Sequence, residues 1–217
     1  RILIMSNLKN LILGAGVAVA LMASCSGNQT LSGLNPTAFD TTINGKKVAL
    51  YTLTNKSGME VCITNFGGRV VSMMVPNKDN QMVDVVLGYD NIKQYADTNN
   101  FGHCLHGGPS GWQYQVYDAT QIDDQTLELK LVSKDGDNGF PGTVTATATY
   151  KLTDDNALDC TFEATTDKET VINMCNHSYF SLTGNPSQPG TDMVLFINAD
   201  KYTPTDSTYM TTGEIKD

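Results

Sequence analysis

The chain has 217 residues, of which 40% are hydrophobic and 17% are charged, and its formal net charge at pH 7 is -9. This length suits one large domain, and the apolar content is sufficient for a hydrophobic core. An acidic chain repels a phosphate backbone, so the composition argues against a nucleic-acid partner.

The N-terminal segment has the features of an export signal. Lys9 precedes an apolar run from Leu11 to Ala23, which is too short to span a bilayer comfortably. Small residues then lead into Cys25, as in the lipobox at which bacterial lipoproteins are cleaved and acylated, although Met22 departs from the usual leucine. We therefore expect residues 1–25 to be a signal peptide with a lipobox-like cysteine and Cys25 to be lipidated. Ordinary secretion and a buried core helix are the alternatives.

This signal predicts where the protein resides. We expect an exported bacterial protein, held as a lipoprotein in the periplasm or on the outer membrane. The membrane is then a partner only through the N-terminal lipid anchor. The polar stretch 26–40, which contains Asn35-Pro36, is typical of a tether between such an anchor and a folded domain.

The sequence beyond residue 40 predicts an all-β domain. Its hydrophobic runs are short, rich in β-branched residues and separated by turn sequences such as Asn44-Gly45. No stretch after residue 40 shows a sustained helical period. We therefore predict that residues 41–217 form an antiparallel β-sandwich. The runs expected to be strands are 48–55, 59–66, 69–76, 83–89, 126–133, 143–153, 157–166 and 170–182.

Cysteine and histidine spacing predicts neither a particular disulfide nor a metal site. No CxxC pair occurs, and spacing alone cannot choose among the pairings open to the four cysteines that follow Cys25. His103, Cys104 and His106 are half of a possible metal site, but zinc requires three or four ligands. We expect no metal.

The stretch 101–112 combines two of the three histidines with a Gly-Gly pair and the only tryptophan. Gly107-Gly108 permits positive φ angles and a close ligand approach directly after His106. Trp112 is suited to stacking on the C–H face of a sugar, although core packing is the commoner role of tryptophan. This stretch is a candidate binding loop.

The third histidine, His177, lies in a strand-like run. A histidine in a strand is most often a packing residue. Here Asn176, Ser178 and Tyr179 surround it, and these side chains can fix the imidazole tautomer and bind a polyhydroxylated ligand. His177 is therefore also a candidate for proton transfer.

Several separated motifs resemble the aldose 1-epimerase family, also called galactose mutarotases. They occur in the family's order and cover nearly everything from about Thr41 onward. The motifs are VVLGYDN at 85–91, LHGG at 105–108, DGDNGFPGTVTATATYKL at 135–152, TTDKETVINMCNHSYFSLTG at 165–184 and YTPTDSTYMTTGEI at 202–215.

The resemblance implies a galactose mutarotase-like supersandwich that interconverts the α and β anomers of aldohexoses such as glucose and galactose without metal or organic cofactor. It implies that His177 is the general acid toward the ring oxygen and that a glutamate is the general base. It also implies that His106 and Tyr179 bind the sugar. Imidazole titrates near neutrality and suits proton donation. The expected partner is a small aldohexose, and the protein is expected to be a monomer.

Two departures from the family pattern affect this expectation. The GR-x-x-NRI stretch, whose arginine contacts substrate, is missing at Asn99-Asn100, and Arg69 is expected to be a surface residue rather than its replacement. The sequence also stops after Thr212–Asp217, before the family's substrate-binding aspartate and base glutamate. We therefore expect an incomplete sandwich, internally deleted and truncated, with impaired catalysis.

Two further functional hypotheses remain open. One is a non-catalytic carbohydrate-binding lipoprotein whose sugar cleft consists of His106, Tyr179 and Trp112. The other is a secreted β-sandwich without a ligand. Saturable sugar binding without rate enhancement distinguishes the first of these from an epimerase.

Overall fold

A computed structural model of the chain describes residues 29–95 and 105–217. The predicted signal peptide with Cys25, the residues His103 and Cys104, and the junction at Asn99-Asn100 lie outside the described residues. The chain divides into two compact units, residues 1–187 and 188–217, and each unit is described by itself.

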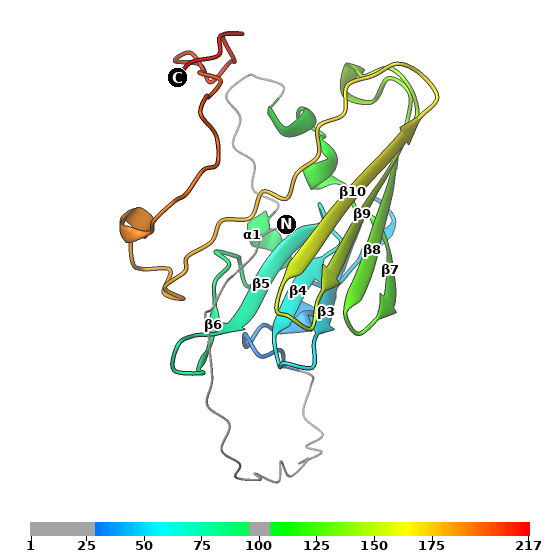
Figure 1. Ribbon diagram of the computed structural model, residues 1–217. Coiled ribbons are helices and arrows are strands. Elements are labelled where there is room, and N and C mark those ends of the chain that lie inside the picture. Colours follow the sequence, from blue (N-terminus) through cyan, green and yellow to red (C-terminus); the bar gives the residue numbers. More distant parts are fainter. Residues whose placement is uncertain (1–28, 96–104) are drawn as a thin grey trace. The chain divides into compact units, whose positions relative to one another are not determined.

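The first unit is built from antiparallel strands, as expected. In the described residues its two larger sheets have the strand orders β3-β4-β5-β6 and β10-β9-β8-β7, and β1 and β2 form a separate hairpin. Figure 1 shows the two four-stranded layers. The strands are β1 (Thr41–Ile43), β2 (Lys46–Val48), β3 (Leu50–Thr54), β4 (Glu60–Thr64), β5 (Arg69–Pro76), β6 (Met82–Asp84), β7 (Asp118–Asp123), β8 (Thr126–Ser133), β9 (Val144–Leu152) and β10 (Leu158–Thr166).

Helical structure in the described residues is confined to short turns. The one α-helix among them, α1, covers Ile92–Tyr95. The rest are 3-10 turns: η1 (Pro36–Ala38), η2 (Leu105–Gly107), η3 (Trp112–Tyr114), η4 (Asp137–Gly139) and η5 (Gly190–Asp192). Within the described ranges no helix has the length and apolar character needed to cross a bilayer.

The main core lies between the two large sheets. In β9 buried and partly exposed residues alternate, because successive side chains of a strand point to opposite faces. Leu127 and Leu129 of β8 and Val61 and Ile63 of β4 are fully buried in one cluster. The sandwich is therefore closed by residues from both sheets.

A second core covers the other face of β4 and β5. All five residues of β4 are buried, although only alternate residues can face the other sheet. Cys62 points away from the sandwich and packs in a cluster with Phe39, Leu34 and Val71. The continuous apolar pattern of β4 thus follows from burial on both faces.

The described part of the predicted tether, residues 26–40, packs on the folded domain. Phe39 is fully buried and Leu34 is 8% exposed. The backbone N–H of Leu31 donates to the buried carboxylate of Glu60 at 2.8 Å. The described part of residues 26–40 therefore packs on the domain, because it covers the second face of the β3–β6 sheet.

We expect Phe39→Ala to destabilise the protein by about 3–5 kcal/mol, because it empties a fully buried aromatic site. Leu31→Ala is the matched control, since Leu31 lies in the same stretch but is 56% exposed. Urea unfolding followed by circular dichroism measures both. Equal stability of the two variants would show that this stretch is a tether after all.

Two other segments depart from the sequence prediction. Residues 170–182 form no regular strand; they make a single antiparallel bridge, Val86 to Phe180. Strand β7 was not predicted, because its residues are mostly polar and exposed. It pairs along β8, so neighbouring backbone rather than apolar periodicity specifies it.

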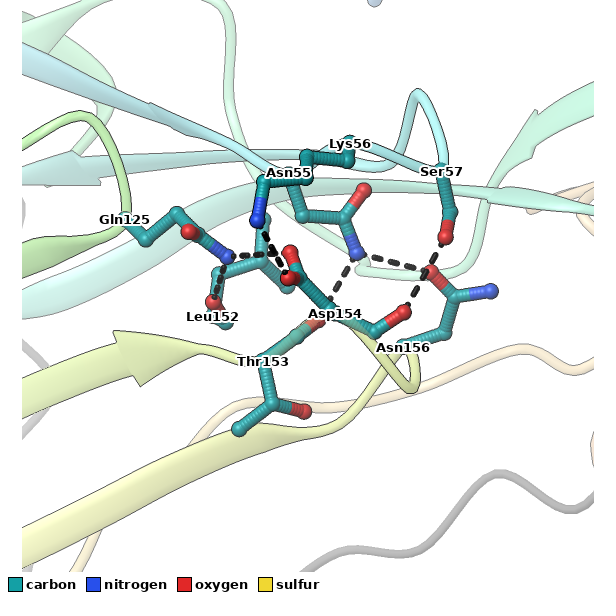
Figure 2. Close-up of polar contacts among 8 residues, drawn as sticks. All are labelled: Asn55, Lys56, Ser57, Gln125, Leu152, Thr153, Asp154 and Asn156. Carbon is teal, nitrogen blue, oxygen red and sulfur yellow. Dashed lines mark hydrogen bonds and ion pairs between the residues drawn. The ribbon is translucent and has the colours of Figure 1, made fainter.

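A polar cluster joins turns from both sheets at one end of the sandwich (Figure 2). The side-chain amide of Asn55, which is 9% exposed, donates to the Thr153 carbonyl and to the Asn156 side chain, both at 2.8 Å. Gln125 donates to the Leu152 carbonyl at 2.8 Å. The Lys56–Asp154 ion pair at 3.0 Å is exposed and adds little. The buried amide therefore fixes how these turns meet.

The second unit, residues 188–217, contains η5 and two isolated bridges, Tyr202 to Lys216 and Thr205 to Thr211. The apolar run Val194–Ile197 is exposed, with Val194 at 95%. The described residues thus fall into two units, and the single domain over residues 41–217 stays a prediction.

Candidate functional site

A cavity of about 780 Å³ opens in the first unit. Residues from the stretches 67–70, 106–114 and 170–179 and from β9 line its wall. The sequence-predicted residues His106, Trp112, His177 and Tyr179 are all among them. The structure therefore brings both described histidines and both aromatic candidates to one cavity.

The LHGG loop presents His106 through an unusual backbone. His106 has φ 55°, Gly107 has φ 89° and Gly108 has φ 95°. Residues with side chains rarely adopt such angles, whereas glycine does so readily. A Cβ atom on Gly108 would lie 3.1 Å from the side-chain oxygen of Asn138. The two glycines thus allow the loop to turn at the cavity wall beside η4.

Asn138 holds the other end of this loop. Its side-chain oxygen accepts hydrogen bonds from the Ser110 hydroxyl at 2.7 Å and from the Ser110 backbone N–H at 3.3 Å. Asn138 itself has φ 50° and belongs to the DGDNGFPG motif. This motif therefore supports the binding loop, a role that the sequence did not reveal.

The extended segment after β10 carries His177. The Leu87 N–H donates to the Tyr179 carbonyl, and the Ser181 N–H donates to the Val85 carbonyl, each at 2.8 Å. These bonds fasten the segment beside the end of β6. The side chain of His177 is exposed, so His177 is not a packing residue of the core.

The two histidine rings lie edge to face. Their centroids are 4.8 Å apart with an interplanar angle of 86°. The Tyr179 ring lies 5.4 Å from the His177 ring at 58°. Two groups that can donate or accept protons and one phenol hydroxyl therefore meet at one position on the cavity wall.

A short hydrogen-bond chain connects this wall to the core. The Tyr150 hydroxyl donates to the Gly68 carbonyl at 2.7 Å, and Asn176 donates to the Tyr150 oxygen at 3.4 Å. The Asn176 side-chain oxygen accepts from the Ser178 N–H at 3.0 Å. The residues flanking His177 are thus tied to β9 and to the turn before β5.

Trp112 fits both roles considered for it. Its side chain packs against the main core while lining the cavity. Sugar stacking by Trp112 stays a prediction. The described residues contain no group of three His, Cys, Asp or Glu side chains arranged to hold a metal ion. The metal reading of residues 103–106 falls partly outside those residues.

Arg69 lies in a different place from the one expected. The sequence reading treated it as a surface residue, yet its side chain is half-buried and lines the cavity. It stands at the start of β5, directly after Gly67-Gly68. The chain has only one other arginine, at residue 1, and this rarity was the signal that could have drawn attention to it.

The pKa of His106 lies below its ordinary value of 6.5, first because of partial desolvation and second because of the charge of His177. Above pH 6.5 the His106 ring is neutral in both the folded and the unfolded protein, so its burial costs no stability. As the pH falls from 6.5 through the pKa of the folded state, protonation of the ring in the unfolded protein lowers the free energy of unfolding. His106 is therefore a neutral proton acceptor near pH 7.

We expect the His106 titration midpoint, measured by NMR, to rise in His177→Ala while staying below 6.5, because desolvation remains the larger cause. Leu182→Ala, an exposed change in the same segment, should leave the midpoint unchanged. An unchanged midpoint in His177→Ala would show that the two imidazoles do not interact.

We compared the chain with protein families and with known proteins. The family model described as "Aldose 1-epimerase" matches residues 49–102 and 97–217. The chain belongs to the aldose 1-epimerase family. The aldose 1-epimerase of Escherichia coli (strain K12) is 32% identical over 194 residues, which cover 75% of this chain and 56% of that protein. The galactose mutarotase of Sus scrofa is 29% identical over 188 residues, covering 72% and 54%.

Solved structures of aldose epimerases share the fold. A GalM/aldose epimerase homologue from C. elegans has a TM-score of 0.70 at 25% identity, over 78% of this chain and 61% of that one. The galactose 1-epimerase from Lactobacillus acidophilus has a TM-score of 0.67 at 24% identity, over 82% and 60%. The predicted family and all-β class are confirmed. The chain spans less than two thirds of the length of each of these relatives.

Proposed function

We propose that this aldose 1-epimerase family chain interconverts the α and β anomers of aldohexoses such as glucose and galactose. One observation carries the proposal: the rings of His106 and His177 lie 4.8 Å apart on the wall of one cavity. An exposed imidazole in a cavity can give up and recover a proton within one turnover.

In the proposed reaction His177 donates its proton to the ring oxygen of the sugar while a base removes the proton of the anomeric hydroxyl. The bond between the ring oxygen and the first carbon breaks, which leaves an open-chain aldehyde and a new hydroxyl. Rotation about the bond between the first two carbons turns the aldehyde over. The reverse proton transfers then close the ring as the other anomer.

In this scheme His106 and Tyr179 bind hydroxyl groups of the sugar. His106 is neutral near pH 7 because its pKa is lowered, so it can accept a hydrogen bond from a sugar hydroxyl. Tyr179, 67% exposed, offers its phenol group beside His177. No described residue is assigned to the glutamate base that the family resemblance implies.

The test is polarimetry of freshly dissolved α-D-galactose and α-D-glucose with the purified chain. Catalysis accelerates the approach to the equilibrium rotation relative to buffer and leaves the final rotation unchanged. The expectation of impaired catalysis stays a prediction that the same rates test. A rate equal to buffer, from protein shown to be folded, would contradict the proposed reaction.

The exposed Tyr179 beside a cavity also favours a second candidate, sugar binding without catalysis. Isothermal titration with D-galactose would then show saturable binding while polarimetry shows no acceleration. A flat titration would exclude this candidate.

We also propose that export and lipidation at Cys25 anchor the protein to a bacterial membrane. The support is the apolar run that ends in a small-residue stretch before Cys25. Incorporation of labelled palmitate should be lost in Cys25→Ser and kept in Cys175→Ser. Equal labelling of both variants would contradict this anchor.

A further inference from the structure

The side chain of Arg69 is held at the cavity by contacts with Phe66 and Tyr95. Its Nη1 donates to the Phe66 carbonyl at 2.9 Å. The guanidinium carbon lies 5.0 Å from the Phe66 ring centroid and 5.4 Å from the Tyr95 ring centroid. A Cβ atom on Gly67 would lie 2.7 Å from Nη1. The glycine therefore leaves the space that the guanidinium occupies.

Most N–H donors of the Arg69 guanidinium make no hydrogen bond to the described residues. A guanidinium has five N–H donors, and the described residues accept from one of its nitrogens, Nη1. Burial lowers the pKa of Arg69, and the opposing influences come from Tyr95, Tyr114 and Tyr117 rather than from a carboxylate. A half-buried cation with unpaired donors is costly unless a ligand or water satisfies it.

A purely structural role explains only part of this arrangement. Fastening the Phe66 carbonyl needs one donor, and stacking on aromatic rings needs only the guanidinium face. Neither role requires the side chain to line a cavity together with His106 and His177. The guanidinium presents several N–H donors in one plane, and these can donate to neighbouring hydroxyl oxygens of a sugar.

We propose that Arg69 is a substrate-binding residue that donates hydrogen bonds to ring hydroxyl oxygens of a neutral aldohexose in this cavity. The inference rests on the proposed function for its sugar class. It assigns to the first residue of β5 a binding role that none of the family motifs carries. His177 acts on the ring oxygen, and Arg69 holds hydroxyls elsewhere on the same sugar.

The experiment measures the Kd of D-galactose by isothermal titration for the unaltered chain, Arg69→Met, Arg69→Lys and the control Lys130→Met. Lys130 lies on the exposed side of β8 and outside the cavity. We expect at least about tenfold weaker binding for Arg69→Met, because bonds from a charged donor are lost, a smaller loss for Arg69→Lys, and none for Lys130→Met. Melting temperatures show whether each variant is folded.

Monodeoxy-galactoses provide a readout that a structural role would not move. A monodeoxy-galactose that lacks the hydroxyl bound by Arg69 should bind the unaltered chain more weakly than galactose does. The Arg69→Met protein should bind the two sugars equally well. A structural role predicts the same ratio of deoxy-sugar to galactose affinity in both proteins, and that result would overturn the inference.

Polarimetry on the same proteins separates this inference from the proposed function. Catalysis with unchanged galactose affinity in folded Arg69→Met overturns the binding role alone. Sugar binding that depends on Arg69 without catalysis contradicts the reaction and supports the binding role. Absence of galactose binding by the unaltered chain overturns the binding role as well.

Discussion

Replacing His177 with glutamine should lower the acceleration of galactose mutarotation by about 10²–10⁴-fold, because general acid catalysis contributes that much and an amide cannot deliver a proton. Glutamine keeps hydrogen-bonding groups at the cavity wall, so sugar affinity should change far less than rate. The measurement is the polarimetric rate constant at saturating α-D-galactose. His177 is exposed, so folding should be unaffected.

Leu182→Ala is the control for this change. Leu182 lies in the same extended segment, is 61% exposed and does not line the cavity. It should retain the unaltered rate. A His177→Gln protein that accelerates mutarotation as well as the unaltered chain would remove His177 from the reaction, whatever its place beside His106.

Gly88→Ala should lower the free energy of unfolding by about 3 kcal/mol or prevent folding. A Cβ atom at Gly88 would overlap the carbonyl oxygen of Val71, which belongs to β5, and would lie 3.1 Å from the Tyr95 hydroxyl. A strand backbone cannot move aside as a flexible side chain can. Gly88 also follows Leu87, whose N–H fastens the segment that carries His177.

Gly58→Ala separates this overlap from the general cost of replacing glycine. Gly58 has φ 81° and nothing within 4 Å of an added Cβ, so alanine there meets only the backbone penalty of about 1 kcal/mol. Chemical unfolding of both variants gives the comparison. Similar losses for the two would show that residue 88 does not approach β5 closely.

The sequence predicted the strands whose pattern reflects a single buried face. In β9 the alternation of Val144, Ala146, Ala148 and Tyr150 with threonines matches a strand with one face in the core. Strand β7 has no such pattern, because pairing with β8 specifies it. Local periodicity carries no information on a strand that its neighbour defines.

The burial of Leu34 and Phe39 could not be predicted for a related reason. Polar neighbours make this stretch resemble a linker, yet Phe39 inserts into a second core. That core exists only because β4 and β5 expose a second apolar face, which is a property of the assembled sheet. A single buried aromatic in a polar stretch gives little periodic signal.

The candidate site was predictable in its chemistry but not in its geometry. Motif resemblance identified His106 and His177, which are 71 positions apart in the sequence. Their edge-to-face contact depends on the bonds between the segments around Val85 and Tyr179, which no sequence pattern indicates. Arg69 was misplaced because a charged residue at the start of a strand is usually exposed, and the segments that cover it are distant in the sequence.

The most direct test of the sugar site is NMR of the histidine rings during titration with D-galactose. If the cavity binds the sugar, the resonances of His106 and His177 should shift together, saturate, and give one Kd. Resonances of both rings that remain unchanged up to high galactose concentration, in protein shown to be folded, would contradict a sugar site at this pair of imidazoles.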